Sequence, residues 1–480
     1  MLNTEAIYNL YLFKDVRCQD NRQRLVNALG ENLSDSSGVL LQGGETDRHL
    51  HGFTSDCDRV FRQESYFHWT FGVTEADVYG LVLKTKTILF FPRLPDSYII
   101  WLGKILPLEY YLKYYEVDEV FYTDEISQIL NNNGITTLLT NHGLNTDSGY
   151  MVEPAKFDGI QEFTVDTSTL HPVIAECRVI KSEAEIEVIR YANNVSSDAH
   201  REVMRAMKPN MFEYQFEALF QHYCHDQGGS RHVCYCCIAA SGENSATLHY
   251  GHQGNLRKIL DGDMCLFDMG CEYACYCSDI TCSFPANGKF TERQKQIYNA
   301  VLDANRVVLY AMKPGVSWPD MHRLSEKVIL EALKEMGMVR GDVEEMVSKR
   351  VGALFMPHGL GHFLGCDTHD VHGYPSGVER IQEPGLKSLR TARKLEKGMV
   401  LTIEPGCYFI PSVLSAAFDG PLSEYLVKNK IEEFFDFGGV RIEDNVVVRE
   451  DHAELLTCVP RTVEDIEALM AESPTFSQIS

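Results

Sequence analysis

The chain has 480 residues, with 44 Lys and Arg against 68 Asp and Glu, and its formal net charge is therefore −24. This negative charge argues against nucleic-acid and anionic-membrane partners, because both are bound through cationic surfaces. Hydrophobic residues make up 44% of the chain and charged residues 23%, which is typical of globular domains and excludes the disordered and fibrous classes.

Targeting signals are not recognisable in the sequence. The first residues carry no basic region, and no segment reaches the ~18 unbroken apolar residues of a membrane span. Fifteen cysteines without a secretory signal are typical of reduced thiols in the cytosol. A structural zinc site would need cysteine pairs about two to four residues apart, whereas the clusters at 234–237 and 265–282 alternate with aromatic residues as in strands. We therefore expect a cytoplasmic protein with buried thiols.

The first domain, predicted at residues 1–180, has an α/β pattern. A helical pattern spans residues 18–29, and short apolar runs bounded by Gly or Pro follow at 38–42, 78–83 and 87–91. Such runs are typical of buried strands. This region holds no recognisable catalytic cluster, so we expect the chemistry in the rest of the chain.

The second domain, predicted at residues 181–480, begins with a helix that Ser182 can cap and Glu185 can complete as a capping box. A short internal repeat, which we call the echo, follows. The run Ala206-Met-Lys-Pro-Asn-Met recurs 105 positions later as Ala311-Met-Lys-Pro-Gly-Val. Each copy ends one amphipathic helix and precedes another. The spacing suits two similar αβ halves, although so short a match can arise by coincidence. If the echo is real, a site is expected between the halves.

Two aspartates stand on strand-like runs of this domain. Asp268 ends Met264-Cys-Leu-Phe-Asp, and Asp279 lies eleven positions later, with turn-tolerant residues between them. This spacing predicts the arms of a hairpin, on which directly opposite residues have Cβ atoms ~4.5 to 5.5 Å apart. Two carboxylates so close on an apolar sheet repel each other unless a cation or a proton lies between them.

Two histidines, His358 and His362, stand four positions apart in a glycine-rich run. That spacing can place both on one helical face, but Gly359 and Gly361 favour a loop or bent strand that brings the imidazoles close to a ligand.

Two glutamates complete the candidate site. Glu404 ends an apolar run and is followed by Pro405, and Glu443 lies in a predicted strand with Arg441 on the same face. Four carboxylates and one imidazole form an oxygen-rich set that predicts a site for two divalent ions, with Mn²⁺ favoured and Co²⁺ or Zn²⁺ as alternatives. The five ligand candidates are Asp268, Asp279, His362, Glu404 and Glu443.

These five segments resemble, in order and context, the metal-ligand segments of the pita-bread metallopeptidases. Within that superfamily the chain is similar to the prolidases, the Xaa-Pro dipeptidases, over about residues 21–470. The resemblance implies an α/β (α+β) fold with a creatinase-like N-terminal domain and a pita-bread catalytic domain, whose pseudo-two-fold αβ halves account for the echo. The runs that carry it are Arg62-Gln-Glu-Ser-Tyr-Phe-His-Trp, Ser241-Gly-Glu-Asn-Ser-Ala, Leu248-His-Tyr-Gly-His, Asp279-Ile-Thr-Cys-Ser-Phe-Pro-Ala-Asn-Gly-Lys-Phe and Leu389-Arg-Thr-Ala-Arg.

The resemblance also implies a metal-dependent activity on Xaa-Pro dipeptides, with release of C-terminal proline or hydroxyproline. Glu404, besides binding metal, would accept the proton of the attacking water. His358 and His369 would hydrogen-bond the substrate or the tetrahedral oxyanion. Arg390, assisted by His249, would bind the substrate carboxylate.

Three further residues receive roles from the resemblance. Arg441 would orient Glu443 or the substrate carboxylate, and Tyr235 and Trp101 would form an apolar wall for the proline ring. Because such enzymes are homodimers, the loop-like segment 95–101 is expected to close over the partner's site. The alternatives are an aminopeptidase P acting on longer peptides and a non-catalytic pita-bread binding module. The intact ligands argue against the second, since a binding surface has no need of buried unpaired carboxylates.

Overall fold

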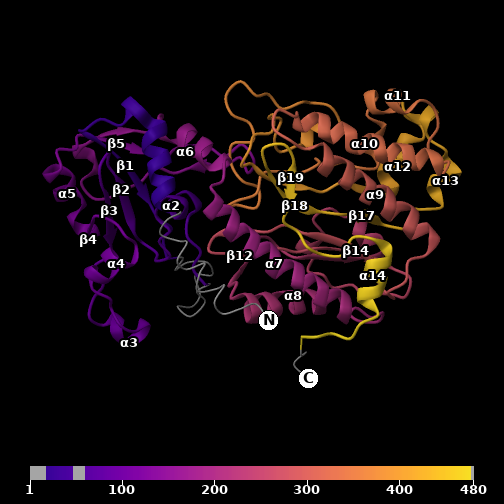
Figure 1. Ribbon diagram of the computed structural model, residues 1–480, viewed down its shortest axis with the longest axis horizontal. Coiled ribbons are helices and arrows are strands. Elements are labelled where there is room, and N and C mark those ends of the chain that lie inside the picture. The colour runs from indigo at the N-terminus through magenta and orange to yellow at the C-terminus, as the bar shows by residue number, and fades with distance from the viewer. Residues whose placement is uncertain (1–17, 47–59, 477–480) are drawn as a thin grey trace. The chain divides into compact units, whose positions relative to one another are not determined.

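The computed structural model describes residues 18–46 and 60–476. The first residues, on which the expectation about targeting rests, lie outside this described part. The chain divides into two compact units, Leu2–Ala184 and Glu185–Ser480 (Figure 1). The domain boundary between residues 180 and 181 remains our proposal. Among the described residues, no helix combines the length and the apolar character that crossing a membrane requires.

The N-terminal unit is built on a mixed six-stranded sheet with the strand order β4-β3-β2-β1-β5-β8. The central pairs β1/β2 and β2/β3 are antiparallel, and β3/β4, β1/β5 and β5/β8 are parallel. The strands are β1 (Ser37–Gln42), β2 (Tyr79–Val82), β3 (Thr87–Phe91), β4 (Glu119–Tyr122), β5 (Thr137–Thr140) and β8 (Thr164–Asp166), and a small hairpin joins β6 (Gly143–Leu144) to β7 (Met151–Val152).

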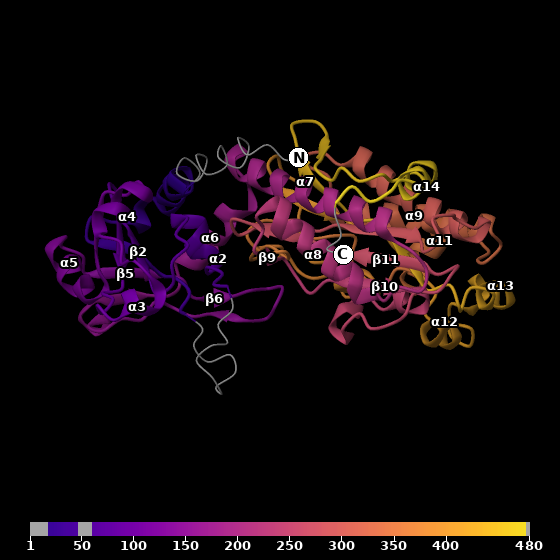
Figure 2. The ribbon, with the colours of Figure 1, turned by 90° about the horizontal axis from the view of Figure 1, so that it is seen from below.

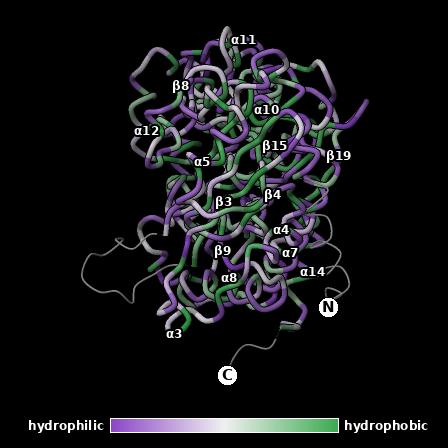
Figure 3. Tube along the Cα trace, turned by 90° about the vertical axis from the view of Figure 1, so that its left-hand side faces the viewer, coloured by the Kyte–Doolittle hydropathy of each residue, from purple (hydrophilic) through white to green (hydrophobic). Residues whose placement is uncertain are grey.

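The predicted elements of this unit are confirmed. Residues 18–29 are helical, and the three apolar runs form β1, β2 and β3. All five residues of β3 are buried, and Figure 3 shows how strands such as β3 coincide with hydrophobic stretches of the chain. The helices are α2 (Ser65–Phe71), α3 (Tyr98–Leu102), α4 (Leu108–Tyr114), α5 (Ile126–Asn132) and α6 (Leu170–Val179).

The segment around Trp101 differs from the prediction. The sequence predicts a loop here, but residues from Tyr98 onward form the short helix α3. The backbone N–H groups of Tyr98, Ile99 and Ile100 each donate to the carbonyl three residues earlier, which closes the helical turns. The Trp101 side chain is 82% exposed.

The C-terminal unit combines long helices with small antiparallel sheets. The helices are α7 (Glu183–Ala206), α8 (Glu213–Gly228), α9 (Glu292–Ala311), α10 (Trp318–Glu335), α11 (Val343–Ser348), α12 (Pro411–Ala417), α13 (Lys428–Glu432) and α14 (Val463–Met470). The strands are β9 (His232–Val233), β10 (Ile238–Ser241), β11 (Met264–Asp268), β12 (Cys271–Tyr273), β13 (Tyr276–Cys277), β14 (Thr281–Pro285), β15 (Val400–Ile403), β16 (Gly406–Tyr408), β17 (Gly439–Arg441), β18 (Asp444–Val448) and β19 (Ala453–Leu455). They form the sheets β10-β11-β14, β13-β12-β9, β15-β18-β19 and β16-β17. Helix α8 packs against β10 (Figure 2), and α9 packs along α10 and against β15 to β17.

The two pseudo-symmetric halves are confirmed. The echoed sequence ends α7 in the first half and α9 in the second, and the next helices, α8 and α10, begin 105 positions apart. Asn210 and Gly315, equivalent at this offset, both have positive φ, +76° and +87°. Equivalent backbone contacts follow, namely the bridges Phe212–Lys258 and Ser317–Lys394 and the hydrogen bonds from Asn210 to Ile259 and from Gly315 to Leu395.

One antiparallel ladder of the second half is interrupted where two ligand candidates lie. β15 pairs with β18 and β16 pairs with β17 in a single continuous register, which places Glu404 opposite Glu443 at the break. Pro405 lacks the N–H that the ladder needs, so the strands stop on either side of it. Glu443 therefore lies between β17 and β18 rather than inside a strand. The flanking pairs are Ile403–Asp444 and Gly406–Arg441.

The cysteines agree with the prediction of reduced thiols. All fourteen cysteines within the described ranges are free, and ten of them are buried. Buried thiols behave as small hydrophobic side chains.

Candidate metal centre and active site

The predicted site residues of the second domain line one cavity of about 540 Å³. The exception is Trp101, which belongs to the N-terminal unit. The structure therefore brings together residues that are far apart in the sequence. They are Tyr235, His249, Asp268, Asp279, His358, His362, His369, Arg390, Glu404, Arg441 and Glu443.

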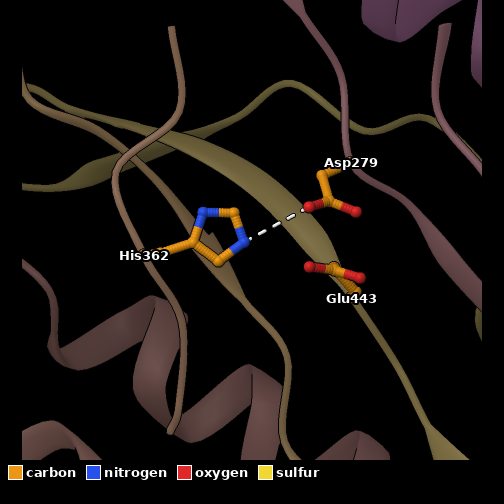
Figure 4. Close-up of side chains that lie close together, drawn as sticks. All are labelled: Asp279, His362 and Glu443. Atoms are coloured by element: carbon orange, nitrogen blue, oxygen red, sulfur yellow. Dashed lines mark ion pairs between the residues drawn. The ribbon is translucent and has the colours of Figure 1, made fainter. Parts of the chain in front are cut away.

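Asp279, His362 and Glu443 form the centre of the cluster. Each offers one ligand atom, and these atoms lie within 4.8 Å of one another; their side chains converge in Figure 4. His362 Nε2 is 3.2 Å from Asp279 Oδ2. Its Nδ1 lies 2.9 Å from the carbonyl oxygen of Phe363, which turns Nε2 toward the carboxylates. Such a backbone contact fixes the imidazole as a metal ligand requires.

The other two ligand candidates flank this trio. Glu404 Oε1 is 3.6 Å from His362 Nε2. Asp268 is held on both oxygens, because Tyr235 donates to Oδ1 (2.6 Å) and Arg441 donates to Oδ2 (2.6 Å). Opposite Asp268 in the hairpin stands Thr281, so Asp279 is offset by two residues rather than directly across.

Arg441 contacts the carboxylates differently from the sequence interpretation. Its guanidinium pairs directly with Asp268 and reaches Glu443 only through Thr281. The Thr281 hydroxyl accepts from Arg441 Nε (3.1 Å) and donates to Glu443 Oε2 (2.6 Å). One cation therefore sets the orientation of two carboxylates.

The glycine-rich run is a loop, as predicted, and close packing explains its glycines. A Cβ at Gly361 would lie 2.1 Å from the carbonyl oxygen of Thr402, and one at Gly359 would lie 2.8 Å from Leu389 Cα. Only glycine permits this approach, which carries His362 against the end of β15.

Burial changes the proton affinities of the cluster. It raises the pKa of Asp268 to about 7, although a neighbouring guanidinium opposes the shift. Burial and the adjacent carboxylates hold the pKa of Glu443 well above its usual value, and burial also raises the pKa of Glu404. At Asp279 and His362 burial is the largest single influence, but their mutual hydrogen bond and the neighbouring charges together outweigh it, so the pKa of the acid is lowered and that of the imidazole is raised. A cation among these groups would relieve the repulsion.

The donor atoms fit divalent ions of hard or borderline character. The trio and its neighbours offer carboxylate oxygens and one imidazole nitrogen. Cys234 also lines the cavity, but burial raises its pKa well above the ordinary value, which keeps it a neutral thiol. Soft thiolate coordination is therefore disfavoured here.

His358 and Tyr408 form a hydrogen-bonded chain that the sequence did not reveal. Burial, reinforced by Arg441, lowers the pKa of His358 to about 3, so its imidazole is neutral. Its Nδ1 lies 2.8 Å from the carbonyl oxygen of Gly359, an acceptor only, so Nδ1 carries the proton and Nε2 accepts from the Tyr408 hydroxyl (2.9 Å). Tyr408 in turn accepts from Arg441 (2.9 Å).

The remaining candidates surround the cluster. The ring of His369 lies 4.4 Å from that of His362, centroid to centroid. Burial, followed by the charges of Arg441 and Arg390, lowers the pKa of His249, which places that imidazole among cations. The cavity thus carries both the acidic cluster and a cationic region beside His249.

Two family models match the chain. "Metallopeptidase family M24" matches residues 187–450, and "Aminopeptidase P, N-terminal domain" matches residues 18–136. The chain belongs to metallopeptidase family M24. The M24 match covers the whole candidate site, so the expectation of a metal-dependent hydrolase is confirmed, and divalent ions are required as cofactors. A non-catalytic binding module is correspondingly disfavoured.

Curated relatives of this M24 member include Xaa-Pro dipeptidases. Those of Mus musculus and Homo sapiens are each 57% identical over 458 residues, which cover 94% of this chain and 92% of the relative. Solved structures with 30% sequence identity include Pseudomonas aeruginosa aminopeptidase PepP (TM-score 0.77) and zinc-substituted E. coli aminopeptidase P in complex with product (TM-score 0.74). In both cases the match covers 95% of this chain and 98% of the other. The predicted pita-bread fold with a creatinase-like N-terminal domain is confirmed.

Proposed function

We propose that this M24 member hydrolyses Xaa-Pro and Xaa-hydroxyproline dipeptides and releases the C-terminal imino acid. The observation that carries the proposal is the polarity of the cavity. Arg390 and His249 line the same cavity, of about 540 Å³, as the carboxylate cluster. A dipeptide has a cationic amine and an anionic carboxylate at its two ends, and such a cavity complements both. The 57% identity with Xaa-Pro dipeptidases, against 30% with the aminopeptidase P structures, supports dipeptides over longer substrates.

The scissile bond explains why this chemistry suits the cluster. The amide before proline is tertiary and has no N–H, so a peptidase cannot grip it by that hydrogen. When bound by Asp268, Asp279, His362, Glu404 and Glu443, two divalent ions would polarise the carbonyl and lower the pKa of the attacking water.

The protein's own groups supply the proton transfers and the orientation. Glu404 is the base in this proposal, since its carboxylate lines the cavity 3.6 Å from His362 Nε2, where it would take a proton from water and return it to the leaving nitrogen. His369 donates to the substrate or its oxyanion. His358 contacts the substrate through an imidazole whose orientation Tyr408 fixes.

Three finer properties belong to the same proposal. Mn²⁺ is the favoured metal, with Co²⁺ and Zn²⁺ as alternatives, because oxygen-rich sets with one imidazole suit these ions. The chain works in the cytoplasm as a homodimer. Tyr235, whose hydroxyl is committed to Asp268, presents its ring to the proline, and Trp101 does so from the partner subunit.

The substrate's carboxylate provides the sharpest test. A charge-assisted contact with Arg390 is worth ~1.5 to 3 kcal/mol, which is roughly 10- to 150-fold in kcat/KM if it persists in the transition state. We expect Arg390→Ala to impair cleavage of Gly-Pro by that factor and to leave the slow cleavage of Gly-Pro-amide nearly unchanged. Lys387→Ala, an exposed cation of the same segment, is the matched control and should behave as wild type.

The outcome separates the two peptidase types. If the wild-type enzyme cleaves Gly-Pro-amide or a Gly-Pro-containing tripeptide as fast as Gly-Pro, the dipeptidase proposal fails and an aminopeptidase P activity takes its place. The enzyme's metal content by elemental analysis, two ions per chain in our proposal, is an independent check.

A further inference from the structure

Two buried polar residues occupy equivalent positions on the helices behind the metal cluster. His200 lies on α7 and Asn305 on α9, 105 positions apart, which is the offset that relates the two halves. Both side chains are fully buried. Neither lines the cavity, so neither can touch substrate.

Asn305 bridges the two strands that carry the glutamates. Its Nδ2 donates to the carbonyl oxygens of Ile403 (3.0 Å) and Ile442 (3.3 Å), the residues that directly precede Glu404 and Glu443. Its Oδ1 accepts from Arg306 (2.7 Å). Because guanidinium groups only donate, this contact fixes which end of the amide faces the carbonyls.

The interrupted ladder explains why a donor is needed there. Ile442 and Pro405 form a pair in the register, and the Ile442 N–H donates to the Pro405 carbonyl (3.2 Å). The return bond to the Ile442 carbonyl cannot form, because proline has no N–H. A buried carbonyl without a partner costs about 1–3 kcal/mol, and Asn305 supplies the missing donor.

His200 makes a corresponding contact with the backbone in the first half. Its Nε2 lies 2.9 Å from the carbonyl oxygen of Met269, and the Met269 N–H in turn donates to the Ile280 carbonyl (3.1 Å). Met269 follows Asp268 and Ile280 follows Asp279. Burial lowers the pKa of His200 to about 4, and its Nδ1 has no partner among the described residues, so the single proton of the neutral ring lies on Nε2.

We propose that His200 and Asn305 are positioning residues for the metal centre, each fixing the backbone beside carboxylate ligands of its own half. The Asn305 amide reaches a carbonyl on both strands, next to both ligands of its half, and the His200 imidazole reaches the Met269 carbonyl, next to Asp268. The two pairs of carboxylates thereby keep the separation that two cations need. This inference rests on the proposed metal site and goes beyond it, since neither residue is a ligand.

Mn²⁺ binding to metal-free protein tests the inference without using turnover. Free Mn²⁺ is followed by its paramagnetic resonance signal during titration of wild type, His200→Phe and Asn305→Leu, variants that keep the approximate volume and lose the donor. We expect each to bind Mn²⁺ at least about tenfold more weakly, the loss typical of groups that orient metal ligands. His200→Asn, which restores an N–H donor as in the other half, should recover most of the affinity.

Further variants exclude a general loss of structure. Gln294, a buried residue at the start of α9, donates a partly buried hydrogen bond to the Gly262 carbonyl but contacts no ligand strand near the cluster. Gln294→Ala should lower the unfolding temperature and leave Mn²⁺ affinity unchanged. If Asn305→Leu does not fold, Asn305→Asp is the alternative. It keeps the size of the side chain and the contact with Arg306, but its carboxylate oxygen cannot donate to the two carbonyl oxygens and repels them. It should show the same loss of Mn²⁺ affinity.

Wild-type affinity in the donor-free variants, or an equal loss in Gln294→Ala, overturns the inference and leaves the proposed peptidase activity standing. A wild-type protein that binds no Mn²⁺ overturns both.

Discussion

The backbone and side-chain contacts of Asp279 place its carboxylate in the metal cluster. Its backbone N–H donates to Asn445 Oδ1 (2.9 Å), which fixes the chain at that point, and its carboxylate faces His362. The pKa of this acid is lowered while those of its carboxylate neighbours are raised, so Asp279 is the anion around which the cluster is organised. That contrast comes from the imidazole contact, because burial alone would raise all of them.

We therefore expect Asp279→Asn to abolish turnover and metal-dependent stabilisation. Wild-type protein at a Mn²⁺ concentration 100 times the Kd should gain about 2.7 kcal/mol in unfolding free energy, whereas the variant should gain almost none. Thermal unfolding with and without Mn²⁺ measures this gain. Asp303→Asn, an exposed position on α9, is the control and should respond as wild type. Activity retained in Asp279→Asn would contradict the assignment.

The neutral His200 predicts a particular pH dependence of stability. Its pKa is lowered from 6.5 to about 4 in the folded protein, so the unfolded state binds more protons between these values. Stability is therefore lost as the pH falls from about 6.5 to about 4, by up to about 3 kcal/mol for this group. Urea unfolding of metal-free protein should show this loss in wild type and a smaller one in His200→Asn. Parallel pH profiles of unfolding free energy for the two proteins would refute this role of His200.

Sequence patterns reveal chemically unusual residues and miss ordinary ones. Carboxylates on apolar strands and a histidine between glycines stand out, and the structure gathers them in one cavity. Tyr408, Thr281 and Asn305 are unremarkable in sequence, since a tyrosine, a threonine or an asparagine is common in any domain. Their roles depend on which backbone or side-chain atoms the fold places beside them.

At the scale of elements, the glycine-rich loop and the broken ladder together place the ligands. The N–H of Glu404 donates to the Leu360 carbonyl (2.8 Å) and that of Thr402 to the His362 carbonyl (2.9 Å), so the loop packs along β15 almost as another strand. Gly361 permits this approach. A side chain there would push the loop, and with it His362, away from the carboxylates.

Gly361→Ala should therefore weaken Mn²⁺ binding and lower kcat/KM by at least about tenfold, because its Cβ would lie 2.1 Å from the carbonyl oxygen of Thr402. The control is Gly420→Ala, whose Cβ would meet nothing closer than 3.6 Å. Metal titration and steady-state kinetics of the two variants measure the difference. Equal behaviour of both variants would show that the close approach does not position His362.

The elements themselves were predictable where the pattern was long or bounded. Apolar runs between Gly and Pro predicted β1 to β3, and the repeated Ala-Met-Lys-Pro located the ends of α7 and α9. The short helix α3 was missed because five residues give too little periodicity to separate a helix from a loop. The break at Glu443 was missed because its cause, Pro405, lies on the opposing strand.

At the scale of the whole molecule, the N-terminal unit carries an exposed apolar helix. On α3, Trp101 is 82% exposed and Ile100 is 79% exposed. Exposed apolar side chains that adjoin one another mark surfaces that meet a partner or a ligand. We therefore retain the proposal that α3 closes over the active site of a second copy and so adds Trp101 to a site whose other residues all come from the C-terminal unit.

Mixing two defective variants tests this role in trans. Asp279→Asn lacks a ligand but keeps Trp101, and Trp101→Ala keeps the ligands but lacks the apolar wall, so each alone should be impaired with Gly-Pro. If the wall comes from the partner, a heterodimer contains one complete site, and random reassociation at equal amounts should restore about a quarter of wild-type activity. Light scattering establishes the dimer. Tyr150→Ala, which removes another exposed aromatic side chain, is the control substitution for Trp101→Ala and should leave activity with Gly-Pro unchanged. A monomeric wild type with full activity, or no recovery on mixing although heterodimers form, would place the role of Trp101 outside the partner's site.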